Sequence, residues 1–210
     1  MNMAEIGPPD YLDLNDTERL AFRRTAGTGV GVVFLCGHGS DMDGTKALEA
    51  EAWARATGRP FLRFDYRGHG QSSGNFLDGT ISSWTSDCLA ALDALTDGAQ
   101  ILVGSSLGGW LMLNVALARP DRVAGLIGIA AAPDFTEDLL WSEFSDEQRR
   151  IIEADGVIAL PNPYSDEPVR YTWNLITDGR TNLRLRGGLE IACPVHLLHG
   201  MKDEEVPWQT

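Results

Sequence analysis

The chain has 210 residues, of which 43% are hydrophobic and 22% charged, as is ordinary for one soluble globular domain. Its formal net charge of -13 argues against nucleic-acid partners and anionic membrane surfaces, because such a surface repels phosphates. Three scattered cysteines without a C-x-x-C pair fit a reducing compartment. Without a leader pattern or a long apolar run, the sequence predicts a cytoplasmic protein with no stable membrane insertion.

Short β-branched runs alternate with helical patterns along most of the chain. We expect two antiparallel strands over 11–14 and 19–24, then strands over 31–36, 61–65, 101–104, 123–131 and 195–198, with helices over 47–56, 83–95 and 107–118. This alternation indicates βαβ units. The predicted fold class is therefore α/β, with a mostly parallel sheet covered by helices on both faces.

One long insertion, at about 133–188, interrupts this alternation within a single domain that spans 1–210. Short helices are expected over 137–154 and 169–176, on either side of the Pro-rich run PNPYSDEP. An insertion of this length is typical of a cap over an active site, although two helices that merely cover the sheet remain the alternative. Its large aromatic residues could line an acyl pocket or simply pack the helices: Trp141, Phe144 and Trp173.

The strongest chemical signal is the motif Gly104-Ser105-Ser106-Leu107-Gly108, between a predicted strand and a predicted helix. In G-x-S-x-G the nucleophile stands on a sharp, strained turn, and the small residues let neighbouring chains approach closely. The helix that follows directs its free N–H groups and positive dipole end at the reacting carbonyl. We predict Ser106 as the nucleophile, with Ser105 in the x position of the motif.

An oxyanion hole requires two N–H donors, and the residue after the nucleophile, Leu107, supplies one. The second should come from the loop after the first buried strand, which reads Cys36-Gly37-His38-Gly39-Ser40. Alignment of the strand end favours the main chain of His38, although Cys36 takes the place where a histidine is usual. A different register would make Ser40 the donor.

The acid of a catalytic triad should follow a late strand. The run HLLHGMKD places Asp203 just beyond such a strand, where a carboxylate can orient a histidine and stabilise its imidazolium. Glu204 and Glu205 are expected to face solvent. Asp203 is therefore the predicted acid.

The catalytic histidine is expected to be absent from this chain. In this class the histidine follows the acid, whereas His38, His69, His196 and His199 all precede Asp203. We interpret His199 as structural and His69 as a loop-shaping residue, and a side-chain role for His38 beside the nucleophile is a weaker alternative. The expectation is a C-terminally incomplete domain that lacks the last strand and helix and leaves a sheet edge unprotected.

Neither a metal nor a cofactor is predicted. The run Asp41-Met42-Asp43-Gly44 resembles the start of a calcium loop, but the later ligands and the closing Glu are missing. The glycine-rich stretch 104–109 lacks the Lys-Ser/Thr of a phosphate-binding loop.

Four runs of sequence together carry a family resemblance: FLCGHGSDMDGTKALEAEAWA, RFDYRGHGQSSG, ILVGSSLGGWLMLNVALARPDRVAGLIGIAAAPDF and LLHGMKDEEVPW. They resemble the α/β-hydrolase family of the mitochondrial palmitoyl-protein thioesterases, which also cleave acyl-glucuronides such as that of mycophenolic acid, and the chain resembles a bacterial relative. The resemblance implies a cofactor-free serine hydrolase that uses Ser106 and Asp203. It implies a small-molecule or acylated-protein substrate with a thioester or ester bond. The alternatives are a general carboxylesterase and a non-catalytic fragment or pseudoenzyme.

Overall fold

A computed structural model describes residues 7–162 and 167–210 of the chain. Its main sheet has seven strands, in the order β1-β2-β4-β3-β5-β6-β9. Their bounds are β1 Asp10–Asp13, β2 Arg19–Thr25, β3 Gly31–Leu35, β4 Phe61–Phe64, β5 Gln100–Ser105, β6 Val123–Ile129 and β9 Val195–Leu198. The pairs β1–β2 and β2–β4 are antiparallel, and all other neighbours are parallel. The predicted α/β class and the antiparallel entry are confirmed.

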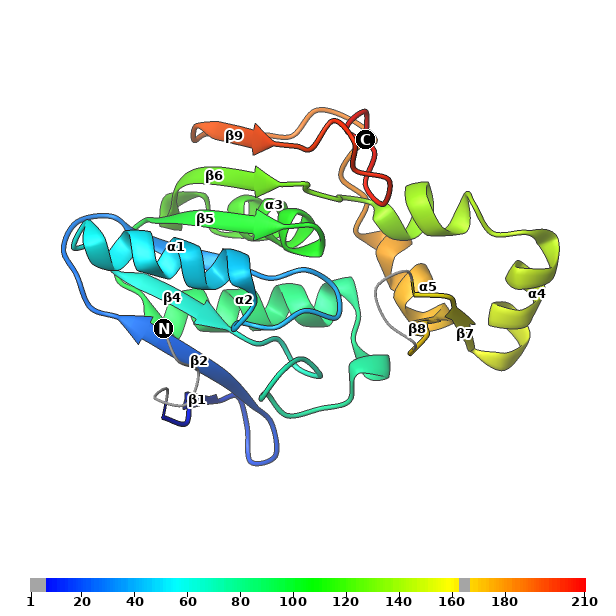
Figure 1. Cartoon of the computed structure of the whole chain (residues 1–210), viewed down its shortest axis with the longest axis horizontal. Coiled ribbons are helices and arrows are strands. Elements are labelled where there is room, and N and C mark those ends of the chain that lie inside the picture. The colour runs from blue at the N-terminus through cyan, green and yellow to red at the C-terminus, as the bar shows by residue number, and fades with distance from the viewer. Residues whose placement is uncertain (1–6, 163–166) are drawn as a thin grey trace.

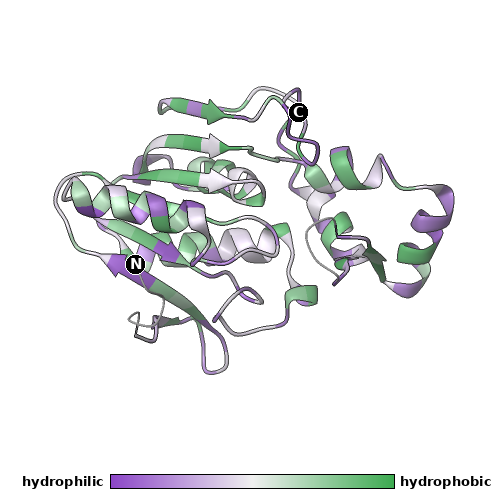
Figure 2. Ribbon diagram, in the orientation of Figure 1, coloured by the Kyte–Doolittle hydropathy of each residue, from purple (hydrophilic) through white to green (hydrophobic). Residues whose placement is uncertain are grey.

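Three helices cover the two faces of the sheet: α1 Thr45–Ala56, α2 Ile81–Leu95 and α3 Leu107–Ala118. In Figure 1, α1 lies in front of the sheet, while α2 and α3 lie behind it. Every residue of β3 and β4 is buried, as two covered faces require. Figure 2 shows apolar colouring along much of the neighbouring strands β5 and β6. Short helical turns, η2 Phe76–Asp78 and η3 Pro120–Arg122, complete the connections.

The cap lies beyond the carboxyl ends of the parallel strands (Figure 1). It is built from η4 Thr136–Trp141, α4 Asp146–Asp155, β7 Val157–Leu160, β8 Val169–Thr172 and α5 Trp173–Thr181. The predicted helix over 137–154 is wrong as one element, because Ser145 and Gln148 form a capping box that starts a separate helix. The predicted helix over 169–176 begins as a strand, and the Pro-rich run lies partly outside the described residues.

The cap has a small apolar core of its own. Phe144, Ile152, Ile158 and Ile176 are buried together, and partly buried aromatic and aliphatic side chains pack around them. The rings of Trp141 and Trp173 lie 5.4 Å apart. None of the three aromatic residues that were candidates for an acyl pocket lines the cleft described below, so packing is their role.

The two ends of the cap insertion meet at Asp134, a fully buried residue with a φ of 60°. Its carboxylate accepts hydrogen bonds from the main-chain N–H groups of Arg184 and Leu185, at 2.7 and 2.8 Å. One carboxylate thus joins the segment that enters the cap to the segment that leaves it.

Strand β9 is an edge strand of the sheet, next to β6. All four of its residues are exposed, including Leu197 at 69% and Leu198 at 60%. The expected unprotected edge is therefore present in this structure. Within 7–162 and 167–210, every helix is too short or too polar to cross a bilayer.

Candidate active site

Ser106 lies on the sharp turn between β5 and α3. Its backbone has a φ of 52° and a ψ of -117°, in a region that residues other than glycine rarely adopt. The turn is held from both sides, because the Ser106 N–H donates to the Ile129 carbonyl and the Ser106 carbonyl accepts from Ala132. The Ser106 hydroxyl does not cap α3. The strained turn expected of G-x-S-x-G is present, and it leaves that hydroxyl available.

Glycine is required at several positions around Ser106 because neighbouring parts of the chain approach these positions too closely for a Cβ atom. A Cβ on Gly104 would lie 2.3 Å from the Gly108 carbonyl oxygen, and one on Gly108 would lie 2.1 Å from the Leu35 carbonyl oxygen. Gly109 is equally confined, because its Cβ would meet the Ala131 side chain at 2.4 Å. These approaches tie the turn to the strands on both sides of β5.

The loop after β3 passes directly beside Ser106, since a Cβ on Gly37 would lie 3.4 Å from the Ser106 Cβ. We call residues 37–40 the oxyanion turn. Its Ser40 N–H donates to the Gly37 carbonyl at 3.1 Å, and Gly39 has a φ of 69°, as in a type II turn. The Ser40 N–H is therefore engaged within the turn, which favours the His38 register.

The main-chain N–H groups of His38 and Leu107 have no acceptor among the residues that the structure describes. Leu107 is the first residue of α3, where a helix leaves its N–H groups without an intrahelical partner. Both groups are thus available for an oxyanion.

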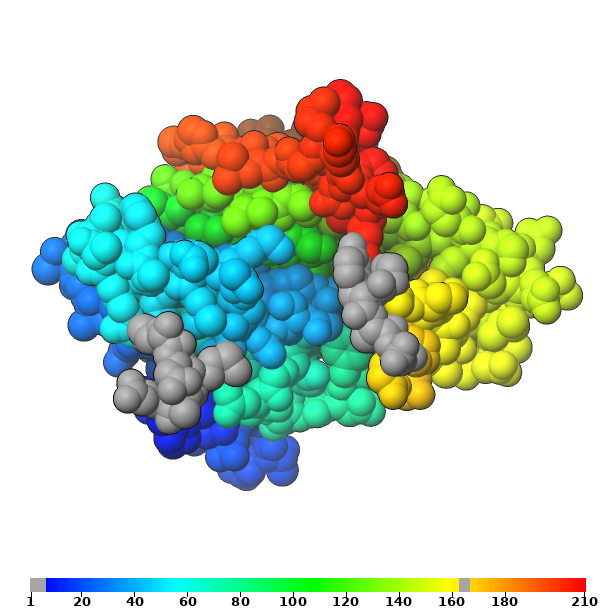
Figure 3. Space-filling model, viewed as in Figure 1, coloured from blue at the N-terminus to red at the C-terminus, as the bar shows by residue number. Residues whose placement is uncertain are grey.

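A cleft of about 960 Å³ opens between the oxyanion turn and the cap, and Ser106 lies on its wall. The cap contributes apolar side chains to it, among them Leu139, Leu140 and Leu160. Charged groups stand at other positions around it: Asp41, Glu167, Arg170 and Glu205. Figure 3 shows the C-terminal residues, in red, next to the cap, in yellow-green. The cleft therefore offers an apolar wall and charged groups in the neighbourhood of Ser106.

The half-buried side chain of His38 is packed among aromatic rings. The neighbouring ring centroids lie 4.8 to 5.9 Å away, in Phe76, Tyr171, Trp84 and Phe135. Burial, together with the nearby His69, lowers the pKa of His38 to about 3. Because the ring is packed among these side chains, its role is structural. The main-chain N–H of His38 is then the only group of this residue that could serve an oxyanion hole.

Asp203 lies on the loop after β9, half-buried. Its Oδ1 accepts from the main-chain N–H groups of Glu205 and Val206, at 3.1 and 3.0 Å. His199 closes the same loop, with its Nε2 2.6 Å from the Val206 carbonyl oxygen. Glu204 and Glu205 are exposed, but Glu205 also lines the cleft, which the sequence did not predict.

No histidine side chain is hydrogen-bonded to Ser106 or Asp203 in the part of the chain that the structure describes. His196 is exposed, and His69 is 3% exposed and faces other partners. The structure thus brings Ser106, His38 and Leu107 together, and none of the described histidine side chains is hydrogen-bonded to the serine. The two carboxylates of the calcium-like run are engaged nearby, since Asp43 pairs with Arg63 and Asp41 accepts from the Asp43 N–H.

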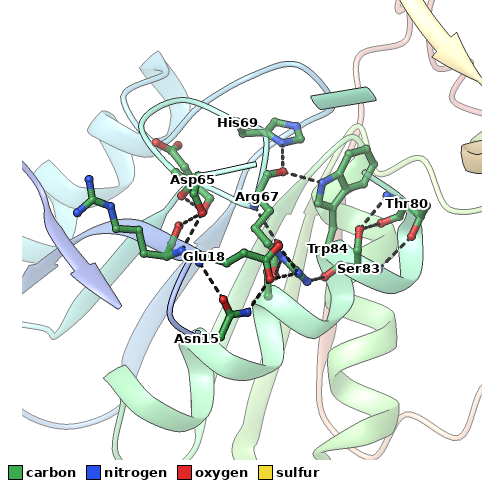
Figure 4. Close-up of polar contacts among 12 residues, drawn as sticks. Asn15, Glu18, Asp65, Arg67, His69, Thr80, Ser83 and Trp84 are labelled. Carbon is green, nitrogen blue, oxygen red and sulfur yellow. Dashed lines mark hydrogen bonds and ion pairs between the residues drawn. The ribbon is translucent and has the colours of Figure 1, made fainter. Parts of the chain in front are cut away.

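The run Asp65-Tyr66-Arg67-Gly68-His69, predicted only to shape a loop, is anchored by part-buried ion pairs. The Arg67 Nε donates to the fully buried Asp87 at 2.8 Å, and its guanidinium also contacts Glu18 at 3.0 Å (Figure 4). The carbonyl of Arg67 accepts from the Trp84 indole at 3.1 Å. A buried carboxylate thus anchors the segment that stands behind the oxyanion turn. The feature of the sequence that could have indicated this anchor is an arginine and a histidine in a Gly-rich turn directly after a strand.

Comparison with known proteins identifies the class of protein to which this fold and this serine turn belong. The model of the Alpha/beta hydrolase family matches residues 32–210, and the chain belongs to this family. The mitochondrial palmitoyl-protein thioesterase ABHD10 of Bos taurus is 42% identical over 204 residues, and that of Homo sapiens is 42% identical over 201. Each match covers 95% of this chain, which spans 65% of the length of these curated relatives.

Two solved structures are similar throughout the chain. Alpha/beta hydrolase domain-containing protein 10 from mouse has a TM-score of 0.88 and 41% identity, covering 97% of this chain and 81% of that one. A putative hydrolase from Agrobacterium vitis S4 has a TM-score of 0.89 and 39% identity, covering 96% and 81%. The predicted α/β-hydrolase fold is confirmed by both.

Proposed function

We propose that this protein is a serine hydrolase that cleaves acyl thioesters or esters with Ser106 as its nucleophile. The observation that carries the proposal is the strained, positive-φ backbone of Ser106 on the turn into α3, beside two unengaged N–H groups. The relatives named as palmitoyl-protein thioesterases support the choice of an acyl substrate. The apolar cap wall of the cleft is suited to an acyl chain.

In the proposed reaction a base removes the Ser106 proton while Oγ attacks the acyl carbonyl carbon. The N–H groups of His38 and Leu107 stabilise the oxyanion, which forms only as the carbonyl becomes tetrahedral. The C–S or C–O bond then breaks, the thiol or alcohol leaves with a proton, and water hydrolyses the acyl-enzyme. Asp203 would orient a histidine that acts as the base, a role that none of the four histidines here occupies.

The test is labelling by a fluorophosphonate probe of the protein expressed from its natural reading frame. We expect covalent labelling that Ser106→Ala abolishes and Ser105→Ala retains, because Ser105 is buried in β5 beside the nucleophile. Ser105→Ala is the matched control for disturbance of the turn. A protein that stays unlabelled, or that labels equally after Ser106→Ala, would contradict the proposal and favour a non-catalytic acyl-binding role.

The same protein should be tested on a series of acyl thioesters and acyl esters of increasing chain length. We expect kcat/KM to rise with chain length until the apolar wall formed by Leu139, Leu140 and Leu160 is filled. Thioesters and esters share the tetrahedral intermediate, so their ratio identifies the preferred leaving group. A rate that does not depend on chain length would exclude the cap wall as the acyl site.

A further inference from the structure

The oxyanion turn is contacted from behind by a histidine that the proposed reaction does not use. The main-chain N–H of Gly39 donates to Nε2 of His69 at 3.3 Å, across 30 positions of sequence. The His69 side chain is 3% exposed, whereas Gly39 is exposed, so the acceptor side of this contact is buried and the donor side faces solvent. Gly39 is the third residue of the turn, next to the proposed donor His38.

The protonation state of His69 follows from its other partner. Its Nδ1 lies 3.4 Å from the carbonyl oxygen of Arg67, which can only accept a hydrogen bond. Nδ1 therefore carries the proton, and a neutral ring leaves Nε2 free to accept from Gly39. Burial favours the neutral ring by lowering the pKa of His69 to about 4, although the Arg67 carbonyl and Asp41 act in the opposite direction.

The position of His69 is itself held firmly. The same Arg67 carbonyl accepts from the Trp84 indole, and Figure 4 shows both donors converging on it. Arg67 is anchored in turn by the buried Asp87, to which its main-chain N–H and its Nε both donate. A chain of hydrogen bonds thus leads from the buried carboxylate of Asp87, in α2, to the oxyanion turn.

The contact matters because it determines the orientation of one peptide group. Type I and type II turns differ by a flip of the middle peptide, which here joins His38 to Gly39. An acceptor placed at the Gly39 N–H selects the type II form, in which Gly39 has its observed φ of 69°. A second contact fixes the chain beyond the turn, since the Met42 N–H donates to the buried Asp65 at 2.7 Å.

We infer that His69 is a positioning residue, whose Nε2 holds the oxyanion turn in its type II form. By fixing the peptide that follows His38, it fixes the position of His38, whose own N–H lies on the preceding peptide and faces the proposed oxyanion. The inference rests on the proposed function, because the oxyanion hole has meaning only if Ser106 attacks a carbonyl. The side chain of His69 does not touch the substrate, and it acts through the Gly39 peptide. Its ring also packs against Phe76 and Trp84, with centroids 5.0 and 5.2 Å away.

The experiment compares His69→Phe with His69→Gln in the protein expressed from its natural reading frame. Phenylalanine keeps the ring packing and removes the acceptor, whereas glutamine can offer an amide oxygen near the position of Nε2. We expect His69→Phe to lower kcat roughly tenfold to a hundredfold, since removing one oxyanion donor outright costs more. KM should stay within about twofold, because the oxyanion exists only in the transition state. His69→Gln should recover most of kcat.

A second readout does not depend on activity. The imidazole 15N spectrum of His69, assigned by its loss in His69→Gln, should show a neutral ring protonated at Nδ1 near pH 7. A ring protonated at Nε2 would overturn the inference, because it cannot accept from Gly39. A kcat unchanged in His69→Phe, or lowered equally in both variants, would also overturn it. If the wild-type protein hydrolyses no acyl substrate, the proposed function fails, and the spectrum alone decides whether His69 holds the turn.

Discussion

The ring of Tyr171, in cap strand β8, lies nearly parallel to the ring of His38, with centroids 5.2 Å apart and an interplanar angle of 15°. His38 belongs to the oxyanion turn and Tyr171 to the cap, so this stack joins the cap to the wall of the cleft that carries Ser106. Both residues line the cleft. The cap and residues 37–40 are therefore in direct side-chain contact.

Tyr171→Ala should weaken this link and raise KM for long acyl substrates about fivefold, which corresponds to the roughly 1 kcal/mol of a stacked aromatic pair. Tyr171→Phe is the matched control, because it keeps the ring and removes only the hydroxyl. Steady-state kinetics on a long and a short acyl thioester would check this. An unchanged KM in Tyr171→Ala would show that the stack does not position the cap.

Ser106→Gly should stabilise the folded protein by about 1 kcal/mol while abolishing hydrolysis. A serine at a φ of 52° and a ψ of -117° is strained, and glycine adopts that conformation without a Cβ clash. Ser106→Ala should abolish hydrolysis without this gain, because alanine keeps the strain. Urea unfolding of the three proteins measures the difference. Equal stability of the two variants would mean that the turn stores no strain.

Gly108→Ala should destabilise the protein by about 3 kcal/mol, because the added Cβ would lie 2.1 Å from the Leu35 carbonyl oxygen. The nearest atoms that this Cβ would meet are all main chain of Leu35 and Cys36, which leaves little room for relaxation. Gly187→Ala provides the comparison, since no atom lies within 4 Å of its Cβ and its free energy of unfolding should change by less than about 0.5 kcal/mol. Similar unfolding midpoints for both variants would contradict the close approach.

Asp134→Ala should destabilise the protein by about 3 kcal/mol, because it removes two part-buried hydrogen bonds to a carboxylate and places alanine at a φ of 60°. Asp134→Asn should be milder, since asparagine tolerates this backbone and keeps one acceptor. Hydrogen exchange at Arg184 and Leu185 would report the loss directly. Protection that survives in Asp134→Ala would show that another group joins the ends of the cap.

The stability of the protein should fall as the pH drops from 7 to 5. Burial lowers the pKa of His69 to about 4, so over this range the unfolded chain binds a proton at this site and the folded chain does not. The imidazole alone should then account for about 2 kcal/mol, present at pH 7 and lost toward pH 5. Urea unfolding at both values would measure it. His69→Phe should remove this part of the decrease, and an identical decrease in that variant would exclude His69 as its source.

Most of the architecture could be predicted from local pattern. The parallel strands and the helices that cover them lie within about two residues of their expected bounds, because β-branched runs and helical periodicity are properties of adjacent residues. The motif around Ser106 predicted its strained turn for the same reason. The position of the cap in the chain was predicted correctly, but the arrangement of its helices and strands was not. Its β7–β8 hairpin joins short segments whose pairing depends on packing against α4 and α5 rather than on local propensity.

The sequence by itself determined the α/β fold class, the position of Ser106 and the segments that could supply the oxyanion donors. Only the tertiary structure decided that the Ser40 N–H is engaged, that the His38 ring packs against Tyr171, and that His69 supports the Gly39 peptide. The physical reason is that a hydrogen bond between residues 30 positions apart requires particular backbone orientations at both ends. Those orientations arise when loops close over a completed sheet, and they leave no periodic trace in the sequence.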